Sequence, residues 1–285
     1  MARTLSPLRY PGGKSRLVRP LLAALGDRKF PTVHEPFCGG ASVTLALVDN
    51  NVALRGRISD ADRIVASFWI SVTEHTGEFC AMIDAETVTV ARHRHWKTAQ
   101  PTATLEQGMQ AFFLNRTSHS GNIHHGGVLG GPGQDEKLAR GEEVKYPVGC
   151  RFNKESLKDS IQHIGALHQR GILTASYGDY LECERDLRRG DLLYLDPPYV
   201  EKSDQLYGHT FTVEDHHRVA EFATRSARNG VHVIVSYDDV PFIHDLYTDP
   251  VWEEPTRPSF AYGMGSAHGK TTSREIMFSN LKLEI

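Results

Sequence analysis

In residues 192–200, LLYLDPPYV, a short apolar run is followed directly by side chains and carbonyls that could take part in catalysis or ligand binding. The first four have the length and content of a strand buried on both faces. The strand has to end at Asp196, because Pro197 and Pro198 cannot donate hydrogen bonds to a sheet. In open α/β sheets, ligands bind at the carboxyl edge of the strands. The segment is therefore expected to present a carboxylate, two rigid carbonyls and the ring of Tyr199 to a ligand.

A glycine turn between a strand and a helix forms a second pattern of this kind. Residues 32–35 have strand character, residues 36–40 read PFCGG, and an apolar helix is expected over 41–48. This layout is typical of nucleotide-type sites, because glycines let a ligand approach the backbone and the helix start offers free N–H groups. The sequence lacks the full G-x-G-x-x-G fingerprint, which disfavours a nicotinamide or flavin cofactor.

An acid follows these glycines at the distance expected for a ribose ligand. Ile58 and Ser59 end a second strand at Asp60. A carboxylate at the tip of this strand, about twenty residues past the glycines, is placed to accept hydrogen bonds from both ribose hydroxyls. Two alternatives stay open: Asp60 caps a helix beginning at Ala61, or Asp62 is the ligand.

Near the N-terminus, Pro-Gly-Gly leads into Lys14. Ser15 is a good N-cap, and the spacing of leucines predicts a helix as far as Leu25. Lys14 would then lie beside the positive end of the helix dipole. The pattern fits either a basic turn at the start of a surface helix or a loop whose backbone and lysine wrap a ligand.

The middle of the chain has a different character. Residues 62–114 are mainly helical in pattern, and residues 115–133 contain six glycines and three histidines, so no core element is expected in this loop. Long irregular loops in compact domains are usually functional or mobile. The histidines His119, His124 and His125 have no carboxylate or cysteine spaced to complete a metal site, so contact with a polar partner is expected in place of a metal.

Regular elements resume after this loop. Asn153 is a predicted N-cap for a helix with Leu157, Ile161, Ile164 and Leu167 on its apolar face. Strands are expected over 172–181, 192–195 and 231–240 and around Met277, with a helix over 214–228. The chain thus predicts an α/β sheet built from residues 1–61 and 166–285, with an inserted, mostly helical domain at 62–165.

Composition limits the class of protein. The 285 residues are 40% hydrophobic and 24% charged, as in ordinary soluble globular proteins. No apolar run is long enough for a membrane span, and the first residues lack a signal core, so a cytoplasmic location is expected. Four scattered cysteines predict reduced, structural residues. The net charge of −3 argues mildly against nucleic acid, although residues 1–30 hold seven Lys/Arg and one acid.

Taken in order, these patterns closely resemble the Dam-type (class alpha) DNA adenine-N6 methyltransferases. The matching stretches cover nearly the whole chain: LRYPGGKSRL, HEPFCGGASV, ISDADRIV, FFLNRTSHSG, CRFNKESL, YLDPPY, VIVSYDD and SREIMFSN. The tetrapeptide DPPY alone is a moderately specific sign of this family, whereas the eight stretches together, in this order, are a strongly specific one. The resemblance implies a Rossmann-like sheet dependent on S-adenosylmethionine, with the insertion acting as a target-recognition domain.

The resemblance also implies roles for individual residues. The catalytic motif is Asp196, Pro197, Pro198 and Tyr199. The cofactor-binding residues implied are Tyr10, Lys14, Phe37, Gly39, Gly40, Asp60, Asp179 and Asp196. The residues implied to contact duplex DNA are Asn115, Arg116, Ser118, His119, Ser120, Asn122, His124, Arg151, Asn153 and Lys154.

Departures from the Dam type bear on the target sequence. His119 stands where that class has an aromatic wedge, and His124 stands where it has an arginine suited to a guanine edge. The segment 126–133 and the run DEKLARGEEVK also differ. We therefore expect duplex DNA as substrate but do not expect GATC as target, and low sequence specificity also fits.

The chemistry of the motif supports the implied reaction independently. An exocyclic amine of adenine is a poor nucleophile, because its lone pair is delocalised into the ring. Asp196 and the Pro197 carbonyl can each accept one amino hydrogen, and positioning contributes much of the rate. Tyr199 would stack on a base that has left the duplex.

Three hypotheses follow. The first is an adenine-N6 DNA methyltransferase acting alone, with a restriction or defence system, or in a phage. The second is amino methylation of cytosine N4 or of RNA, where Asp in place of Ser at position 196 favours adenine over cytosine. The third is a non-catalytic DNA-binding module, against which the intact set of Tyr10, Lys14, Asp60 and Asp196 speaks.

Overall fold

A six-stranded mixed sheet organises the computed structural model, which describes residues 6–9, 13–200, 211–258 and 275–283. The strand order is β3-β2-β1-β4-β5-β6. The pairs β1–β2, β1–β4 and β4–β5 are parallel, and β5–β6 is antiparallel. The predicted α/β class with a Rossmann-like, parallel-rich sheet is confirmed. Within the described part of the chain, no helix is long and apolar enough to cross a membrane.

The strands fall close to the predicted positions, except that the strand predicted over 172–181 ends at Tyr177, because Asp179 caps a 3-10 helix that begins at Tyr180. Their bounds are β1 Phe30–Glu35, β2 Ala53–Asp60, β3 Leu173–Tyr177, β4 Leu192–Leu195, β5 His232–Asp238 and β6 Glu275–Ser279. All four residues of β4 are buried, as expected for a strand covered on both faces. The strand ends directly before Asp196, where the two prolines begin.

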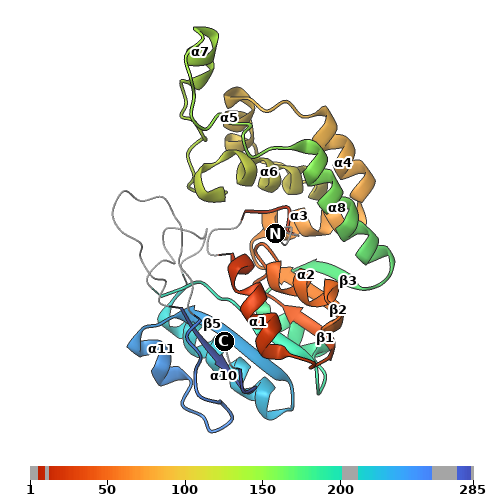
Figure 1. Cartoon of the computed structure of the whole chain (residues 1–285), viewed down its shortest axis with the longest axis vertical. Coiled ribbons are helices and arrows are strands. Elements are labelled where there is room, and N and C mark those ends of the chain that lie inside the picture. The colour runs from red at the N-terminus through yellow and green to blue at the C-terminus, as the bar shows by residue number, and fades with distance from the viewer. Residues whose placement is uncertain (1–5, 10–12, 201–210, 259–274, 284–285) are drawn as a thin grey trace. The chain divides into compact units, whose positions relative to one another are not determined.

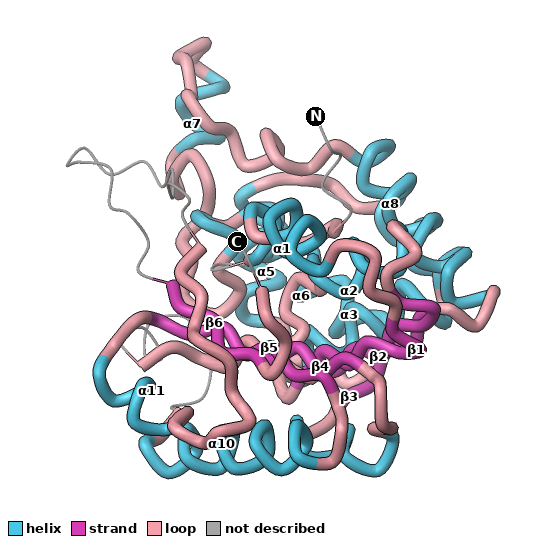
Figure 2. The backbone as a smooth tube through the Cα atoms, turned by 60° about the horizontal axis from the view of Figure 1, so that its bottom comes forward, coloured by secondary structure: helices cyan, strands magenta, loops and turns pink. Residues whose placement is uncertain are grey.

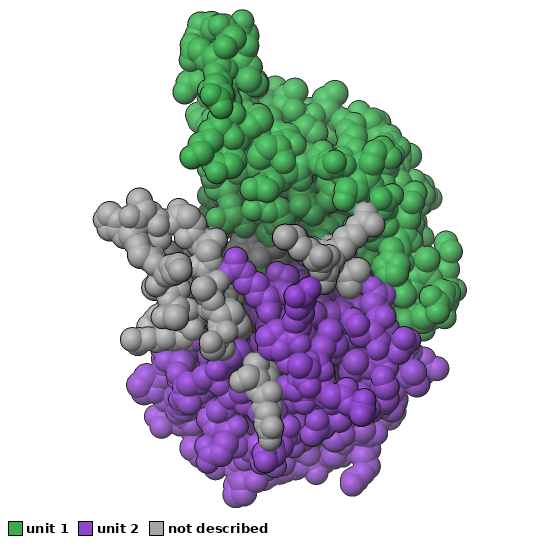
Figure 3. Space-filling view, in the orientation of Figure 1, with its two compact units in different colours: residues 1–13, 59–178 green, residues 14–58, 179–285 purple. Residues whose placement is uncertain are grey.

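Contacts divide the chain into two compact units, coloured separately in Figure 3. One consists of residues 14–58 and 179–285 and is called here the sheet unit. In it, α1 (Val18–Leu25) and α2 (Ser42–Asp49) lie on one face of the strands, and α10 (Val213–Arg228) and α11 (Pro241–Leu246) lie on the other (Figure 2). Val219, Phe222 and Ala223 of α10 pack against Val233 and Val235 of β5 in one core.

The other unit, residues 1–13 and 59–178, is called here the helical unit. Its helices, labelled in Figure 1, are α3 Arg63–Glu74, α4 Thr76–Ala85, α5 Val90–Thr98, α6 Thr104–Thr117, α7 Gln134–Ala139 and α8 Lys154–Gln169. Stacked and edge-to-face rings of Phe68, Phe79 and Phe112 join α3, α4 and α6. Asn153 caps α8 by accepting from Ser156 N, as predicted.

One predicted helix start is wrong, and one of the alternatives for Asp60 is excluded. A short 3-10 helix, η1 (Lys14–Arg16), precedes α1, which begins at Val18, and Ser15 is not its cap. The helix α3 begins at Arg63, and Asp62, not Asp60, caps it by accepting from Ile64 N. Asp60 instead accepts a hydrogen bond from Asp62 N at the end of β2. The helix-cap alternative for Asp60 is therefore excluded.

The predicted loop at 115–133 begins inside the core. The helix α6 continues to Thr117, and Asn115, Thr117 and Ser118 are fully buried, so the expectation that this stretch holds no core element is wrong at its start. The polar sequence misled because the side chains of Asn115 and Thr117 bond to backbone atoms and not to water. Cys150 also differs from the expectation of a structural residue, because it is exposed.

Candidate active site

The carboxylate of Asp196 is held by a buried lysine at the end of β4. Lys14 Nζ donates to both oxygens of Asp196, at 2.6 and 2.7 Å. The Lys14 side chain is only 4% exposed, whereas that of Asp196 is 20% exposed. Lys14 is therefore not a surface lysine at a helix start, and the interpretation as a basic surface turn is wrong.

Glu275 completes this cluster and was not predicted from the sequence. Its side chain is fully buried at the start of β6, with Oε1 at 3.4 Å from Lys14 Nζ. The same oxygen accepts a hydrogen bond from the Tyr199 hydroxyl at 3.0 Å. Lys14 Nζ also lies over the Tyr199 ring, 4.9 Å from its centre. One lysine, two carboxylates and one phenol thus form the buried cluster named here the Lys14 network.

The signal for Glu275 in the sequence was an acid inside an apolar strand pattern. Glu275 directly precedes Ile276, Met277 and Phe278, which are buried. Acids are almost never fully buried unless they are paired. That pattern could have marked Glu275 as a paired acid, but the identity of its partner depends on the strand pairing, which places it opposite Asp238.

The environment of Asp196 raises its pKa to about 6. Burial is the main cause, since it disfavours the charged form, and the negative charge of Glu275 adds to it. The positive charge of Lys14 and hydrogen bonds from Lys14 and Tyr199 act in the opposite direction. At neutral pH Asp196 is therefore mostly ionised and can accept a hydrogen bond.

The rest of the DPPY segment is tied to the neighbouring strand. Asp238, the last residue of β5, accepts from Val200 N at 3.2 Å. Pro197 is buried, and Pro198 and Tyr199 are half-buried. The segment is thus held at Asp196 by Lys14, at Tyr199 by Glu275 and at Val200 by Asp238.

The glycine turn joins β1 to α2 in the same unit. Gly39 and Ala41 have positive φ angles of 42° and 47°, a backbone that turns sharply before α2. Glu35, the last residue of β1, accepts from Thr44 N at 2.8 Å and so ties the strand to the first turn of the helix. Burial raises the pKa of Glu35 to about 8, which keeps it protonated at neutral pH.

This turn fits a nucleoside-type cofactor. The N-cap residue Ala41 provides no side-chain cap to α2, although Thr44 N in the first turn donates to Glu35. The amino end of a helix suits a polar or anionic ligand group. Phe37 stacks on Tyr180 with ring centres 5.1 Å apart, so its ring is fixed beside the turn. Phe37, Gly39 and Gly40 are the residues of the sheet unit that could hold such a cofactor, with Asp196 at the end of β4.

Three further residues are predicted to bind the cofactor: Tyr10, Asp60 and Asp179. Tyr10 lies outside the described residues. Asp60 ends β2 and bonds to Asp62 N. Asp179 accepts from Leu181 N and forms a capping box with Glu182 at the start of the 3-10 helix η3 (Tyr180–Asp186). Their roles toward a cofactor remain predictions.

Several predicted DNA-binding residues make internal contacts. Asn115 Oδ1 accepts from Arg9 N at 2.7 Å, and its Nδ2 donates to Gly121 O at 2.9 Å. The Arg116 side chain donates to Pro7 O, and its burial lowers its pKa to about 10. Lys154 Nζ donates to the carbonyls of Asp84 and Glu86. In this conformation Asn115 and Lys154 hold the fold of the helical unit together.

The remaining predicted DNA-binding residues gather around the turn after α6. His119 and Ser120 are exposed, in the 3-10 helix η2 (His119–Gly121), and Ser120 has a positive φ of 57°. Asn122 Oδ1 accepts from His124 N and His125 N. Ser118 is buried against His93. Arg151 is exposed, close enough to Arg9 and Arg116 to lower the pKa of both.

His124 is linked to the start of α3. Its Nε2 bonds to Asp62 Oδ2, and this bond raises the pKa of His124. Lys97 Nζ donates to the carbonyls of Ile123 and His124. His124 also lines a pocket of about 320 Å³ in the helical unit, together with Lys97, Gln107 and Gln110. Neither contact was predicted, because both join segments far apart in the chain.

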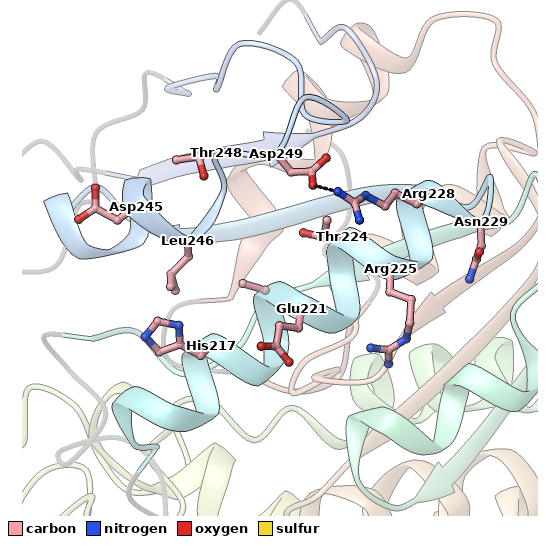
Figure 4. A pocket seen from close by; sticks show the side chains of 11 residues that line it. His217, Glu221, Thr224, Arg225, Arg228, Asn229, Asp245, Leu246, Thr248 and Asp249 are labelled. Carbon is pink, nitrogen blue, oxygen red and sulfur yellow. Dashed lines mark hydrogen bonds and ion pairs between the residues drawn. The ribbon is translucent and has the colours of Figure 1, made fainter.

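A larger pocket of about 610 Å³ lies in the sheet unit, between α10 and the segment after α11 (Figure 4). Its lining is charged, and an ion pair between Arg228 and Asp249 lies within it. None of its lining residues was predicted as a site residue. Its chemistry is that of a solvated surface groove.

The fold and the cluster at β4 define a class of α/β enzyme with an acidic motif at the strand edge, and comparison with known proteins gives the family. Residues 10–99 and 142–258 match the family of D12 class N6 adenine-specific DNA methyltransferases. The chain belongs to this family, which confirms the resemblance seen in the sequence. The matched residues include Lys14, the glycine turn and the DPPY segment, and leave out residues 100–141.

One curated relative is the Type II methyltransferase M1.LlaDCHI of Lactococcus lactis subsp. cremoris. It is 29% identical over 146 residues, which cover 48% of this chain and 50% of that protein. The chain therefore matches about half the length of this relative.

Similar solved structures have low identity. They include the rRNA methyltransferase aviRa of Streptomyces viridochromogenes, at 13% identity over 95% of this chain and 85% of that chain. TrmN of Thermus thermophilus is 10% identical over 94% of this chain and 49% of that chain. A putative methyltransferase, SMU.776, complexed with SAH, is 9% identical over the same shares. All three have TM-scores of 0.38.

Proposed function

We propose that this protein transfers a methyl group from S-adenosylmethionine to the N6 amino group of adenine in duplex DNA. The observation that carries the proposal is the DPPY segment, with Asp196 held ionised by Lys14 at the end of β4, in a chain of the D12 family. The cofactor supplies an activated methyl group on a sulfonium.

The chain's own residues prepare the amine. Asp196 accepts one amino hydrogen and the Pro197 carbonyl accepts the other, which favours a nitrogen whose lone pair points away from both. Tyr199 stacks on the base, which has to leave the duplex to reach this segment. Because an amine need not lose a proton before it attacks, Asp196 acts here as a hydrogen-bond acceptor, and orientation supplies much of the rate. The bond from N6 to the methyl carbon forms as the sulfur–methyl bond breaks, S-adenosylhomocysteine is the leaving group, and the methylated amine then loses one proton to solvent.

Support for the cofactor comes from the glycine turn and the family. The turn at Gly39 and Gly40, ahead of an α2 without a side-chain cap, suits a nucleoside-type ligand. Membership of the D12 family of methyltransferases is the second support, because methyl transfer needs a methyl donor. Roles for Tyr10, Asp60 and Asp179 at the cofactor rest on the sequence pattern. These roles are tested by measuring the equilibrium binding of S-adenosylmethionine and of its adenosine analogues to the wild type and to variants at these three positions.

Duplex DNA is the proposed partner, and the helical unit is its proposed binding surface. The exposed residues His119, Ser120 and Arg151 are the candidates for direct contact, and Asn122, through its backbone bonds, shapes the turn that carries the first two. The proposed location is the cytoplasm, and a restriction or defence system is a proposed context.

A tritiated methyl-transfer assay on duplex DNA, single-stranded DNA and RNA tests the proposal. Incorporation into duplex DNA as N6-methyladenine is expected, and single-molecule sequencing then reads the modified site. Asp196→Ala is expected to abolish transfer while the circular-dichroism spectrum is retained, and Asp196→Asn provides the isosteric comparison. Near-normal turnover in either variant, or label found only in cytosine or RNA, would contradict the proposal.

A further inference from the structure

We propose that Glu275 is a positioning residue for methyl transfer, because it fixes the Tyr199 ring through its hydroxyl and shares Lys14 with Asp196. This inference rests on the proposed function and names a residue that the DPPY motif does not contain. The two contacts start from one oxygen, Oε1 of Glu275, at 3.0 Å from the Tyr199 hydroxyl and 3.4 Å from Lys14 Nζ.

The first contact restricts the ring. A tyrosine that stacks on a base needs only its aromatic face for stacking, so its hydroxyl is available to set the orientation of the ring. Glu275 is fully buried and sits on β6, whose pairing with β5 fixes its backbone. The Tyr199 ring is thereby anchored to the sheet at its outer end, and Val200 N is anchored to Asp238 just beyond it. A preorganised ring costs less ordering when a base stacks on it.

The second contact divides one positive charge between two carboxylates. Lys14 has three N–H donors, and both oxygens of Asp196 and one of Glu275 lie around its Nζ. A third carboxyl, Glu35, lies close enough for its pKa to respond to Asp196 and Lys14. Further titratable groups beside the cluster are Tyr194, Tyr237 and Asp238. With Glu275 present, Lys14 is shared between two carboxylates and the negative charge of Glu275 raises the pKa of Asp196, so the ionised Asp196 is a more basic hydrogen-bond acceptor for the target amine.

Two conservative substitutions separate these contacts. Glu275→Gln keeps the shape and can still accept from Tyr199, but it removes the charge that competes for Lys14. Tyr199→Phe keeps the ring and removes the hydroxyl. Tyr199→Phe loses the hydrogen bond, and Glu275→Gln replaces a charged acceptor with a weaker neutral one, so each variant is expected to lower kcat by about tenfold. In the double variant the losses are expected to combine to less than the product of the two, because the Tyr199 hydroxyl bonds to a neutral acceptor once Glu275→Gln is in place.

A pH profile distinguishes positioning from a purely structural role. Removing the negative charge of Glu275 is expected to lower the pKa of Asp196, so the acid limb of kcat should move to lower pH in Glu275→Gln. The control is Asp191→Asn, an equally buried acid that precedes β4 and pairs with His34. It is expected to lower the melting temperature while leaving kcat and the acid limb unchanged.

A measurement without turnover separates this inference from the proposed function. Titration of Asp196, followed by 13C NMR in aspartate-labelled protein, is expected to shift to lower pH in Glu275→Gln and to stay in place in Asp191→Asn. If the shift occurs but the wild-type protein methylates no nucleic acid, the proposed function fails and the charge sharing stands. If neither the titration nor kcat responds to Glu275→Gln, the inference is overturned. An equal shift in Asp191→Asn would also overturn it.

Discussion

Lys14 donates from one nitrogen to both carboxylate oxygens of Asp196, although 182 residues separate the two in the chain. The pair joins a short 3-10 helix near the N-terminus to the carboxyl end of β4. The Lys14 side chain is 4% exposed and the Asp196 side chain is 20% exposed, so solvent or a ligand can reach the pair through the carboxylate. The lysine serves as a buried counter-charge, and the acid is left to meet a ligand.

Replacing Lys14 by Met should raise the pKa of Asp196 above its value of about 6, because the neighbouring positive charge and its hydrogen bonds hold it down. The acid limb of methyl transfer should therefore move to higher pH. Breaking a buried ion pair is also expected to cost about 3–5 kcal/mol of unfolding free energy. Activity against pH and urea unfolding measure the two effects. Lys29→Met, at an exposed position, is the control and should change neither.

Glu35→Gln should change how stability depends on pH. The pKa of Glu35 is raised to about 8, so between about pH 4.5 and 8 the folded state binds more protons than the unfolded state. The free energy of unfolding of the wild type therefore falls as pH rises through that window. Above about pH 8, Glu35 contributes no further pH dependence. The variant lacks this slope and should gain relative stability on the order of a few kcal/mol by pH 8.5.

Urea unfolding of both proteins at pH 5, 7 and 8.5 measures this difference. A stability difference that stays constant over the three pH values would show that Glu35 does not titrate in this range.

The bond between His124 and Asp62 should hold the turn after α6 in a pH-dependent way. Asp62 raises the pKa of His124, so the stabilisation is present below the unfolded pKa and is lost as pH rises through the folded one. Amide hydrogen exchange of residues 118–128 should be slower at pH 5.5 than at pH 8.5 after correction for intrinsic rates. His124→Gln should abolish this difference, whereas His125→Gln, at the exposed neighbouring residue, should retain it. Equal protection in wild type and His124→Gln at pH 5.5 would contradict the role of the bond.

Asn115→Ala should lower the free energy of unfolding more than does the loss of a helix N-cap in Asn153→Ala. The buried amide bonds to Arg9 N, Arg9 O and Gly121 O, and the variant leaves these backbone groups unpaired. About 3 kcal/mol of unfolding free energy is expected, since a buried unsatisfied group costs about 1–3 kcal/mol. Asn153→Ala, which loses only the cap of α8, should cost about 1 kcal/mol. Chemical unfolding compares them, and equal costs would argue against a structural role for Asn115.

The sequence by itself determined the elements whose signals are local. Prolines 197 and 198 have no N–H to donate, so β4 had to end at Asp196 whatever surrounds it. Asn153 caps α8 through a contact three residues away, and the periodic apolar residues of α8 predicted its buried face. The order of motifs indicated the family. Helix starts were less certain, because Ser15, Asp60 and Asp62 are all acceptable caps and the choice depends on small differences in backbone geometry.

Only the tertiary structure decided which charges meet. The sequence fitted Lys14 to a basic turn as well as to a ligand loop and did not single out Glu275, because neither has a partner nearby in the chain. The pairing of β4, β5 and β6 brings Asp196 and Glu275 to one end of the sheet, and Lys14 reaches both from η1. Burial then makes pairing of these charges necessary. The same reason explains Asn115: its amide looked available to DNA, but backbone groups from Arg9 and Gly121 surround it. Motif order can assign residues to a reaction, but the electrostatics of Asp196 depend on neighbours that only folding supplies.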